Sequence, residues 1–532
     1  MNNQSNGSNN LLKSTTTVGF MTFLSRVMGL VRDICFARLF GAFPIMDAFF
    51  VAFKIPNSFR RFFAEGAFSR AFIPVLSDYE QNKSELETQE LIDKTSGTLG
   101  IILFLVTLIG VLLAPLLIII FAPGFFEQQS VINDRYDIAV DMLRFTFPYL
   151  LFISLTAFAG AILNTKKHFW ATAINPVILN IVLIIAAGFI APNSSNPGQI
   201  LAIAVFIAGL IQLIFLLPFL KTINRLPRPT WGWKDEGVKR IIKLMIPSMI
   251  GSSASQFNLL FNTLIASFLS AGSISWIYYS DRLLEFPVGV FGVALSTVVL
   301  PSLARENANK DLSTYKSTLD WGIKLALIVS IPSAAGLYCL SGPLISTIFL
   351  GGNFTNFDLD MTQYSLMAYS VGLVGLCLVL VLSPAFYSRE DTKTPLKYGL
   401  IAISCNAFFS LLLVLLLIQL GVNYPHMGLA LAFSMASLLN AYLLATKLVK
   451  EKLIQIDKNL IFLVLRILFA TLAMIIFLIA FNQENIVWIN SSLGDRILSL
   501  VFLIGCSVLI YFSVLFLLGF RFREIRIKSE IK

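Results

Sequence analysis

Charged side chains within apolar sequence near the start of the chain are the first candidates for chemistry. Ser25 to Arg70 holds seven bases and three acids: Arg26, Arg32, Asp33, Arg38, Asp47, Lys54, Arg60, Arg61, Glu65 and Arg70. A charge at the centre of a bilayer costs about 2.5–3.5 kcal/mol on insertion scales. So many charges in an apolar stretch therefore predict a wet cavity or a charged ligand. Because the bases outnumber the acids, we expect the ligand to be an anion.

Helical spacing groups the charges of residues 16–41 on a broad polar sector. Arg26 and Asp33 are seven residues apart and share a helix face, as do Ser25 and Arg32. The planar guanidinium suits bidentate binding of a phosphate. We therefore predict Arg26 and Arg32 as phosphate-binding residues, whereas Asp33 is expected to form an ion pair that holds helices together.

The following segment, residues 45–76, continues the pattern. Asp47, Lys54 and Arg61 form a line at seven-residue spacing, and Arg60 follows a proline that should kink the helix. Arg60 is a further candidate for binding phosphate. Glu65 lies four residues beyond Arg61, a spacing at which the two can pair on a helix.

The second half of the chain contains a counterpart, YYSDRLLEFP, at residues 278–287. Asp281, Arg282 and Glu285 lie on one helical turn there. Arg282 is predicted to complete a set of four anion-binding arginines with Arg26, Arg32 and Arg60. Ion pairing is the simpler interpretation for Asp281.

Composition indicates a polytopic membrane protein. The 532 residues are 56% hydrophobic and only 13% charged, whereas a soluble domain has about 25% charged residues. The net charge of +10 is expected in cytoplasmic loops that face anionic lipid, so it does not argue for nucleic acid. Five scattered cysteines and two histidines form no metal-type spacing, and no metal site is expected.

Hydropathy predicts about fourteen transmembrane helices, since a span needs about 20 apolar residues. The expected spans are 16–41, 45–76, 95–122, 138–163, 170–191, 199–220, 241–270, 275–303, 318–349, 362–387, 396–420, 427–448, 459–481 and 495–519. Alternate connections carry the Lys and Arg residues, and Arg135 is the clear exception. By the positive-inside rule, both termini are expected in the cytoplasm.

An internal repeat at a shift of about 227 residues organises these spans. AFSRAFIPVLS at 67–77 aligns with ALSTVVLPSLA at 294–304, and APLLIIIFAPGF at 114–125 aligns with GPLISTIFLGGNF at 342–354. We therefore expect two six-helix lobes in a pseudo-two-fold repeat, an arrangement typical of transporters. The predicted divisions are a polar N-terminal tail (1–14), an N-lobe (15–222), a C-lobe (223–450), two extra spans (451–520) and a basic cytoplasmic tail (521–532).

Four sequence motifs together resemble the MurJ (MviN) family, the bacterial lipid II flippases of the multidrug/oligosaccharidyl-lipid/polysaccharide exporter superfamily. They are SRVMGLVRD, DAFFVAFKIPNSFRRFFAEGAFSRAFIPVLS, YYSDRLLEFPVGVFGVALSTVVLPSLA and YSREDTKTPLK. The resemblance covers nearly the whole chain. It implies two lobes around a central cavity, with the last two helices forming a groove for a polyprenyl tail.

The resemblance also implies a substrate and a set of site residues. The substrate would be lipid II, an undecaprenyl-diphosphate-linked disaccharide pentapeptide, moved from the cytoplasmic to the periplasmic leaflet of the inner membrane for cell wall synthesis. Arg26, Arg32, Arg60 and Arg282 match the arginines expected to hold the diphosphate. A supporting polar network would comprise Ser25, Asp33, Asp47, Lys54, Glu65, Asp281 and Glu285.

The residues leave some partners and alternatives open. There is no Walker A sequence, so no cofactor is expected and the membrane potential or an ion gradient is the default energy source. Membrane lipids and cell-wall synthesis proteins are expected partners of a monomer. Alternatives are a drug or cation antiporter of the same superfamily, a non-transporting scaffold of the cell-wall machinery, and an enzyme acting on polyprenyl diphosphates.

Overall fold

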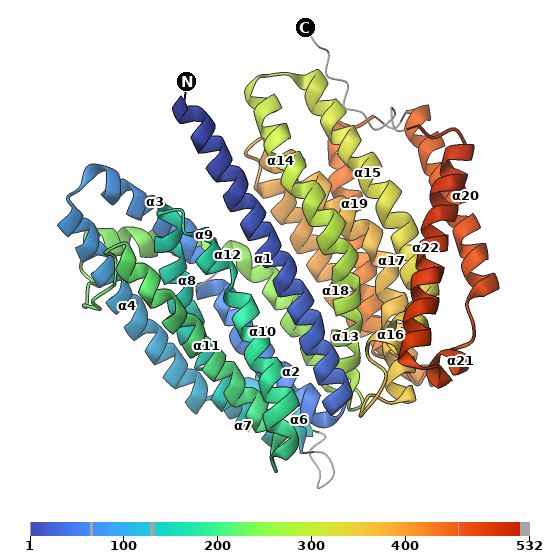
Figure 1. Ribbon diagram of the computed structural model, residues 1–532, viewed down its shortest axis with the longest axis horizontal. Coiled ribbons are helices and arrows are strands. Elements are labelled where there is room, and N and C mark those ends of the chain that lie inside the picture. The colour runs from blue at the N-terminus through green and yellow to red at the C-terminus, as the bar shows by residue number, and fades with distance from the viewer. Residues whose placement is uncertain (1, 64–66, 128–133, 456, 522–532) are drawn as a thin grey trace. The chain divides into compact units, whose positions relative to one another are not determined.

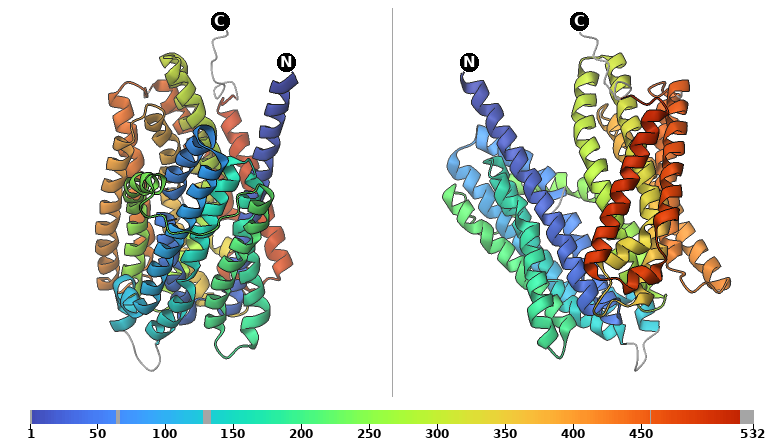
Figure 2. Two further views of the ribbon diagram at one scale, coloured as in Figure 1. Left: turned by 90° about the vertical axis from the view of Figure 1, so that its left-hand side faces the viewer. Right: turned by 45° about the vertical axis from the view of Figure 1, so that its right-hand side comes forward.

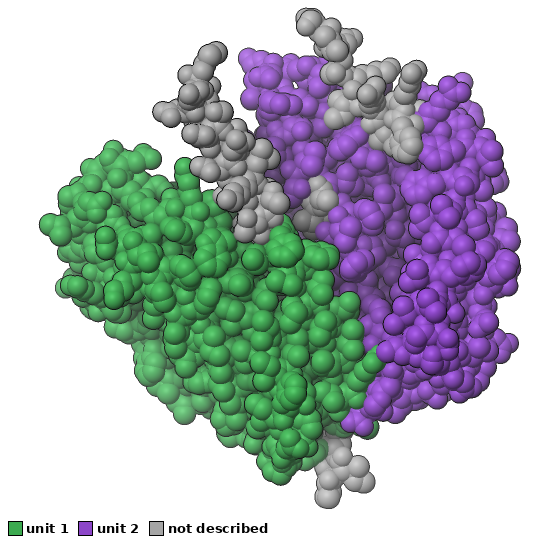
Figure 3. Space-filling model, viewed as in Figure 1, with its two compact units in different colours: residues 1–274 green, residues 275–532 purple. Residues whose placement is uncertain are grey.

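The computed structural model describes residues 2–63, 67–127, 134–455 and 457–521, and every regular element in these ranges is a helix. The chain divides into two compact units, residues 1–274 and 275–532 (Figure 3). The all-helical fold class predicted from the sequence is confirmed.

The first unit begins with a long helix and contains most of the charged stretch (Figure 1). Its helices are α1 (Asn2–Phe40), α2 (Pro44–Phe63), α3 (Ala67–Asn82), α4 (Glu85–Leu112), α5 (Ala114–Phe121), α6 (Pro123–Glu127), α7 (Arg135–Thr146), α8 (Tyr149–Thr165), α9 (Phe169–Ala173), α10 (Asn175–Ile185), α11 (Pro197–Thr222) and α12 (Glu236–Ser267). Short π-helical and 3-10 turns, Ala186–Ile190 and Ala191–Asn193, extend α10.

The second unit contains the Arg282 segment and the C-terminal helices. Its helices are α13 (Ser273–Pro287), α14 (Val293–Ala308), α15 (Leu312–Cys339), α16 (Ser341–Ile348), α17 (Asn356–Tyr387), α18 (Lys393–Gln419), α19 (Met427–Lys450), α20 (Lys458–Phe481), α21 (Asn485–Asn490) and α22 (Leu493–Leu517). A π-helical turn, Val288–Gly292, joins α13 to α14.

The helix bounds repeat at the shift found in the sequence. Adding 227 to the bounds of α4 (85 and 112) gives those of α15 (312 and 339), and the same shift converts α5 (114–121) into α16 (341–348). The N-caps also correspond, because Ser84 accepts from the backbone N–H of Glu87 and Asp311 accepts from that of Thr314. The repeat is therefore confirmed at the level of individual helix ends.

Eleven helices in the described part of the chain are long and apolar enough to cross a membrane. The three expected spans outside this set, 16–41, 45–76 and 241–270, fall on α1, on α2 with α3, and on α12. α2 falls outside the set because four of its twenty residues are charged: Asp47, Lys54, Arg60 and Arg61. The helices that are not apolar enough to be counted as spans thus include α1 and α2, which contain most of the candidate site residues.

The predicted lobe boundaries follow the sequence repeat, and they stay a prediction. α1 begins at Asn2, so it extends into the polar segment 1–14. α12 matches α1 in the repeat, since 40 plus 227 gives 267, yet it packs against α2 and α3 and belongs to the first unit.

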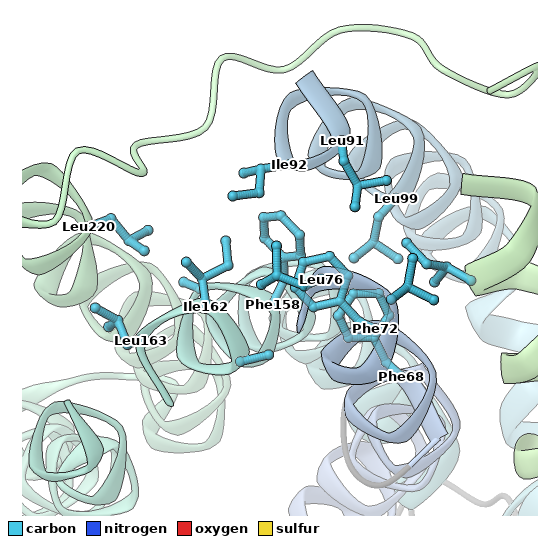
Figure 4. Packing of buried hydrophobic residues seen from close by; sticks show 14 of the residues in the cluster. Phe68, Phe72, Leu76, Leu91, Ile92, Leu99, Phe158, Ile162, Leu163 and Leu220 are labelled. Atoms are coloured by element: carbon cyan, nitrogen blue, oxygen red, sulfur yellow. The ribbon is translucent and has the colours of Figure 1, made fainter. Parts of the chain in front are cut away.

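An aromatic core fixes α3 against α4, α8 and α11 (Figure 4). Phe68 and Phe72 of α3 stack with ring centroids 5.2 Å apart, and Phe158 of α8 meets both rings. Leu91, Ile92 and Leu99 of α4 close the cluster on the other side. Because lipid is as apolar as these side chains, close packing stabilises such a cluster more than the hydrophobic effect does.

The two C-terminal helices pack as a pair on the second unit. α20 and α22 lie side by side (Figure 2), and α20 contacts α15 while α22 contacts α16. The Tyr511 hydroxyl of α22 donates a 2.8 Å hydrogen bond to the Ile328 carbonyl of α15. This bond satisfies the one polar group of a buried side chain and fixes α22 against α15.

Candidate functional site

Arg32 of α1 lies buried between an acid on its own helix and an amide on α10. Its Nε and Nη2 donate to Asp33 Oδ1 at 2.9 and 2.7 Å, and its Nη1 donates to Asn180 Oδ1 at 3.0 Å. Arg32 is 7% exposed and Asp33 is 1% exposed. Asp33 is therefore in an ion pair, as expected, but its partner is the preceding residue of the same helix, so this pair does not join helices. The hydrogen bond from Arg32 to Asn180 joins α1 to α10.

Asn180 also links this pair to Ser25, another member of the predicted polar network. Its Nδ2 donates to the Ser25 carbonyl at 3.2 Å. Arg26, the neighbour of Ser25, is exposed. Six residues separate Arg26 from Arg32, about 9 Å along a helix axis, so α1 presents one accessible and one buried guanidinium.

Asp47 of α2 is completely buried and is held by two partners from other parts of the first unit. The Gly272 N–H donates to Asp47 Oδ2 at 2.7 Å, and Arg135 Nη1 lies 3.7 Å from the same oxygen. The Arg135 guanidinium also lies over the Phe125 ring, 4.6 Å from its centroid. Arg135 was the exception to the loop-charge pattern, and its burial explains why: it stabilises Asp47 inside the protein.

The other polar residues of α2 have contacts of a different kind. Lys54 Nζ donates to the Thr263 hydroxyl of α12 at 3.4 Å, and Arg60 Nε donates to Asn57 Oδ1 at 2.8 Å. Both of these acceptors are neutral. Glu65 lies outside the described residues.

Arg282 belongs to the second unit, where α13 holds it against its own turn. Its Nη1 pairs with Glu285 at 2.8 Å, its Nη2 donates to the Tyr278 hydroxyl at 3.2 Å, and its guanidinium lies 4.8 Å from the Tyr278 ring centroid. Glu285 is exposed, and Asp281 is half-buried on the same helix. The shared turn predicted for these three residues is therefore present.

The described charged residues of the first unit fall into two clusters. Contacts bring Ser25, Arg32 and Asp33 together, whereas Asp47 forms a separate buried pair with Arg135. The anionic ligand expected from the surplus of bases between Ser25 and Arg70 stays a prediction.

No group of three His, Cys, Asp or Glu side chains in the described ranges is placed to hold a metal ion. The arrangement that remains is one of arginines and a lysine with neutral and acidic neighbours in apolar helices. Such groups bind and orient an anion.

Comparisons with known proteins agree over nearly the full length. The family model described as "Lipid II flippase MurJ" matches residues 36–496. A Vibrio cholerae protein named "Probable lipid II flippase MurJ" is 43% identical over 526 residues, covering 98% of this chain and 99% of the relative. A Burkholderia cenocepacia protein named "Lipid II flippase MurJ" is 36% identical over 533 residues, covering 98% and 100%.

Solved structures give the same result for the fold. One described as "Lipid II flippase MurJ, inward closed conformation" matches with a TM-score of 0.77 at 26% identity, covering 93% of this chain and 97% of that one. An inward-facing multidrug resistance transporter of the MATE family matches with a TM-score of 0.65 at 12% identity, covering 81% and 95%. The second likeness concerns the fold alone.

Proposed function

We propose that this chain, which belongs to the lipid II flippase MurJ family, moves lipid II across the bacterial cytoplasmic membrane for cell wall synthesis. The observation that carries the proposal is the surplus of bases in helices α1 and α2, in a chain related to lipid II flippases over its whole length. The chain acts as a transporter, and the reaction is a change of leaflet with no bond made or broken.

The substrate's chemistry matches the residues of the proposed site. Lipid II carries a diphosphate, which a guanidinium can bind through two oxygens at once. Arg26, Arg60 and Arg282 hold this group during transport. Arg32 is paired with Asp33 in a buried pair without net charge, and it reaches the diphosphate only by exchanging Asp33 for a phosphate oxygen.

The polyprenyl tail remains in an apolar environment while the head group crosses. A pocket of about 360 Å³ lies where the end of α20 meets α21 and the start of α22, and its lining residues are Phe481, Gln483, Trp488, Leu498, Ser499, Phe502 and Leu503. Its aromatic and aliphatic walls suit an isoprenoid chain. We assign this pocket the role of tail guide.

The orientation follows from the loop charges. The basic connections and the basic C-terminal segment face the cytoplasm, so both termini lie on that side. The head group then enters from the cytoplasmic leaflet and leaves on the periplasmic side as the two lobes alternate in access. Cell-wall synthesis enzymes that supply and consume lipid II are natural partners of a monomeric transporter.

The membrane potential is the proposed energy source, because a unit charge crossing 100 mV contributes about 2.3 kcal/mol. Collapsing the potential with valinomycin and external potassium, at constant pH gradient, should stop lipid II from reaching the outer leaflet. Transport that continues unchanged would rule out the potential and leave an ion gradient as the source.

The flippase activity itself is tested with purified protein in liposomes that contain fluorescent lipid II in the inner leaflet. A membrane-impermeant quencher added outside reports the fraction that reaches the outer leaflet. The protein should raise the rate of quenching well above that of empty liposomes, and a fluorescent phosphatidylcholine should remain protected. If lipid II is exposed no faster than in empty liposomes, the proposed function is wrong.

A further inference from the structure

A pocket in the first unit is lined in part by α1, where Ser25 directly precedes Arg26 in the sequence, and the proposed diphosphate site does not include it. The pocket has a volume of about 350 Å³. Thr22 and Ser25 of α1, Asn164 of α8, and Phe169 and Thr172 of α9 line it, and small apolar residues complete the wall. We propose that this pocket binds the first sugar of the lipid II head group, the one attached directly to the diphosphate; the inference rests on the proposed function.

The lining chemistry points to a neutral, hydroxyl-rich ligand. Three hydroxyls, one carboxamide and one aromatic ring face the pocket, and none of its lining residues is charged. Polar groups that lack hydrogen-bond partners raise the free energy of a protein where they face lipid. The pocket is therefore expected to open to water. Neutral donors and acceptors around an aromatic ring are suited to a sugar, whose ring carries hydroxyl groups and C–H faces.

Contacts within the pocket organise these groups. The Thr172 hydroxyl lies 3.2 Å from Asn164 Oδ1 and 2.8 Å from the Phe169 carbonyl, to which it can also donate. The contact with Asn164 joins α9 to α8 across the pocket wall, whereas the contact with the Phe169 carbonyl lies within α9. Because the side-chain oxygen of Asn164 accepts from Thr172, the side-chain nitrogen of Asn164 is the group that can donate to a ligand oxygen.

The position of the pocket matches the covalent structure of the substrate. Ser25 precedes the exposed Arg26, and the Ser25 carbonyl is linked through Asn180 to Arg32. A sugar esterified to the diphosphate must lie within a few bonds of the phosphorus atoms. If Arg26 holds the diphosphate, the pocket beside Ser25 is within reach of that sugar.

The size of the pocket limits what it can hold. Ligand pockets usually measure about 300–1,000 Å³, so this one is at the small end of the range. It accommodates part of the head group and leaves the remaining sugar and the pentapeptide outside. The pocket therefore binds only the sugar nearest the membrane.

The test compares two ligands that differ in the sugars and the peptide. Binding of lipid II and of undecaprenyl diphosphate is measured by native mass spectrometry on the purified full-length protein and on Asn164→Leu and Thr172→Val. Each variant should bind lipid II about five- to tenfold more weakly, as expected for one neutral hydrogen bond, and undecaprenyl diphosphate as the wild type does. Thr165→Val is the matched control, because that hydroxyl also donates to a carbonyl three residues earlier but lies outside the pocket.

Other outcomes separate this inference from the proposed function. Arg26→Ala should weaken binding of both ligands. If the wild type binds both ligands equally well, or if the pocket variants weaken both equally, the sugar has no subsite here and the inference is wrong while the flippase proposal stands. If the wild type binds neither ligand, the proposed function fails and the inference fails with it.

Discussion

Arg26 and Arg32 lie on the same helix, but their surroundings differ. Arg26 is exposed and accessible to a ligand. Arg32 is buried, and Asp33 and Asn180 accept hydrogen bonds from three of its nitrogen atoms. Their helical positions alone could not distinguish them, because Asn180 lies on α10, 148 residues away along the chain.

The first prediction concerns the buried pair. Asp33→Asn should lower the free energy of unfolding by about 3 kcal/mol, because it leaves the Arg32 guanidinium buried without its counter-charge. Asp141→Asn is the control, since the pair between Asp141 and Arg144 is half-exposed on both sides and such pairs contribute about 0–1 kcal/mol. Denaturant titrations of both purified variants check this, and equal effects would contradict the account. Adding Arg32→Gln to Asp33→Asn should restore part of the loss.

The second prediction is a pH dependence at the start of α15, outside the membrane spans. Hydrogen bonds from the Thr314 hydroxyl, the Thr314 N–H and the Ser313 hydroxyl lower the pKa of Asp311 to about 2. A lowered pKa means that the ionised carboxylate stabilises the folded state above its ordinary pKa of 3.8, and that this stability is lost as pH falls through about 2.

The measurement compares the wild type with Asp311→Ser, which keeps a neutral cap as at Ser84. The difference in unfolding midpoint between the two proteins should be constant above pH 5 and should shrink between pH 4 and pH 2. A difference that does not change over this range would show that the charge of Asp311 contributes nothing to the cap.

At the scale of elements, a segment without regular structure, residues 228–235, lies closely along the N-terminal half of α4. We refer to it as the strap. The Thr230 N–H donates to the Asp93 carbonyl at 3.1 Å, and the Gly232 N–H donates to the Thr98 hydroxyl at 3.0 Å. Trp231 and Trp233 stack on its exposed side, as is common for tryptophan near a membrane surface.

The third prediction follows from the closeness of this contact. A Cβ added at Gly97 would lie 2.1 Å from the Thr230 carbonyl oxygen, so Gly97→Ala must displace the strap from α4. Cleavage after Lys234 by the protease Lys-C should become at least tenfold faster, as read by mass spectrometry of the fragments. Gly100→Ala is the control, because nothing lies within 4 Å of a Cβ there. Equal cleavage rates for the two variants would mean that the strap does not depend on Gly97.

Helix positions were the most predictable elements, and the repeat explains why. Each half encodes the same succession of helices, so the break at Leu113 recurs at Leu340, 227 residues later. Local features such as caps and prolines set these ends. The partners of the polar residues were less predictable, because pairs such as Asp47 and Arg135 depend on how separate helices pack.

At the scale of the whole molecule, the sequence predicted the class of protein, the family and the type of ligand. The surplus of bases over acids between Ser25 and Arg70 is fixed by the sequence and does not depend on which ion pairs form. Arg32 as the partner of Asn180, and the pocket lined by Thr22, Ser25, Asn164 and Thr172, were not predicted, because only the packing of α1, α8, α9 and α10 brings these residues together.

The most direct test of the central claim is complementation in a bacterium depleted of its own lipid II flippase. The fourth prediction is that the wild type restores lipid II in the outer leaflet, whereas Arg26→Ala, Arg60→Ala and Arg282→Ala fail at equal membrane levels. The reason is that each removes a guanidinium of the proposed diphosphate site. Lysine at the same positions should restore transport only in part, because it keeps the positive charge but lacks the planar guanidinium that binds two oxygens at once.

Exposure of lipid II is measured by its cleavage from outside the cell, and immunoblots of membranes control for the amount of each variant. Arg144→Ala, a change at a half-exposed surface pair, should complement like the wild type. If the three alanine variants all restore lipid II exposure, the arginines do not hold the translocated anion, and the basic surplus has a structural role instead.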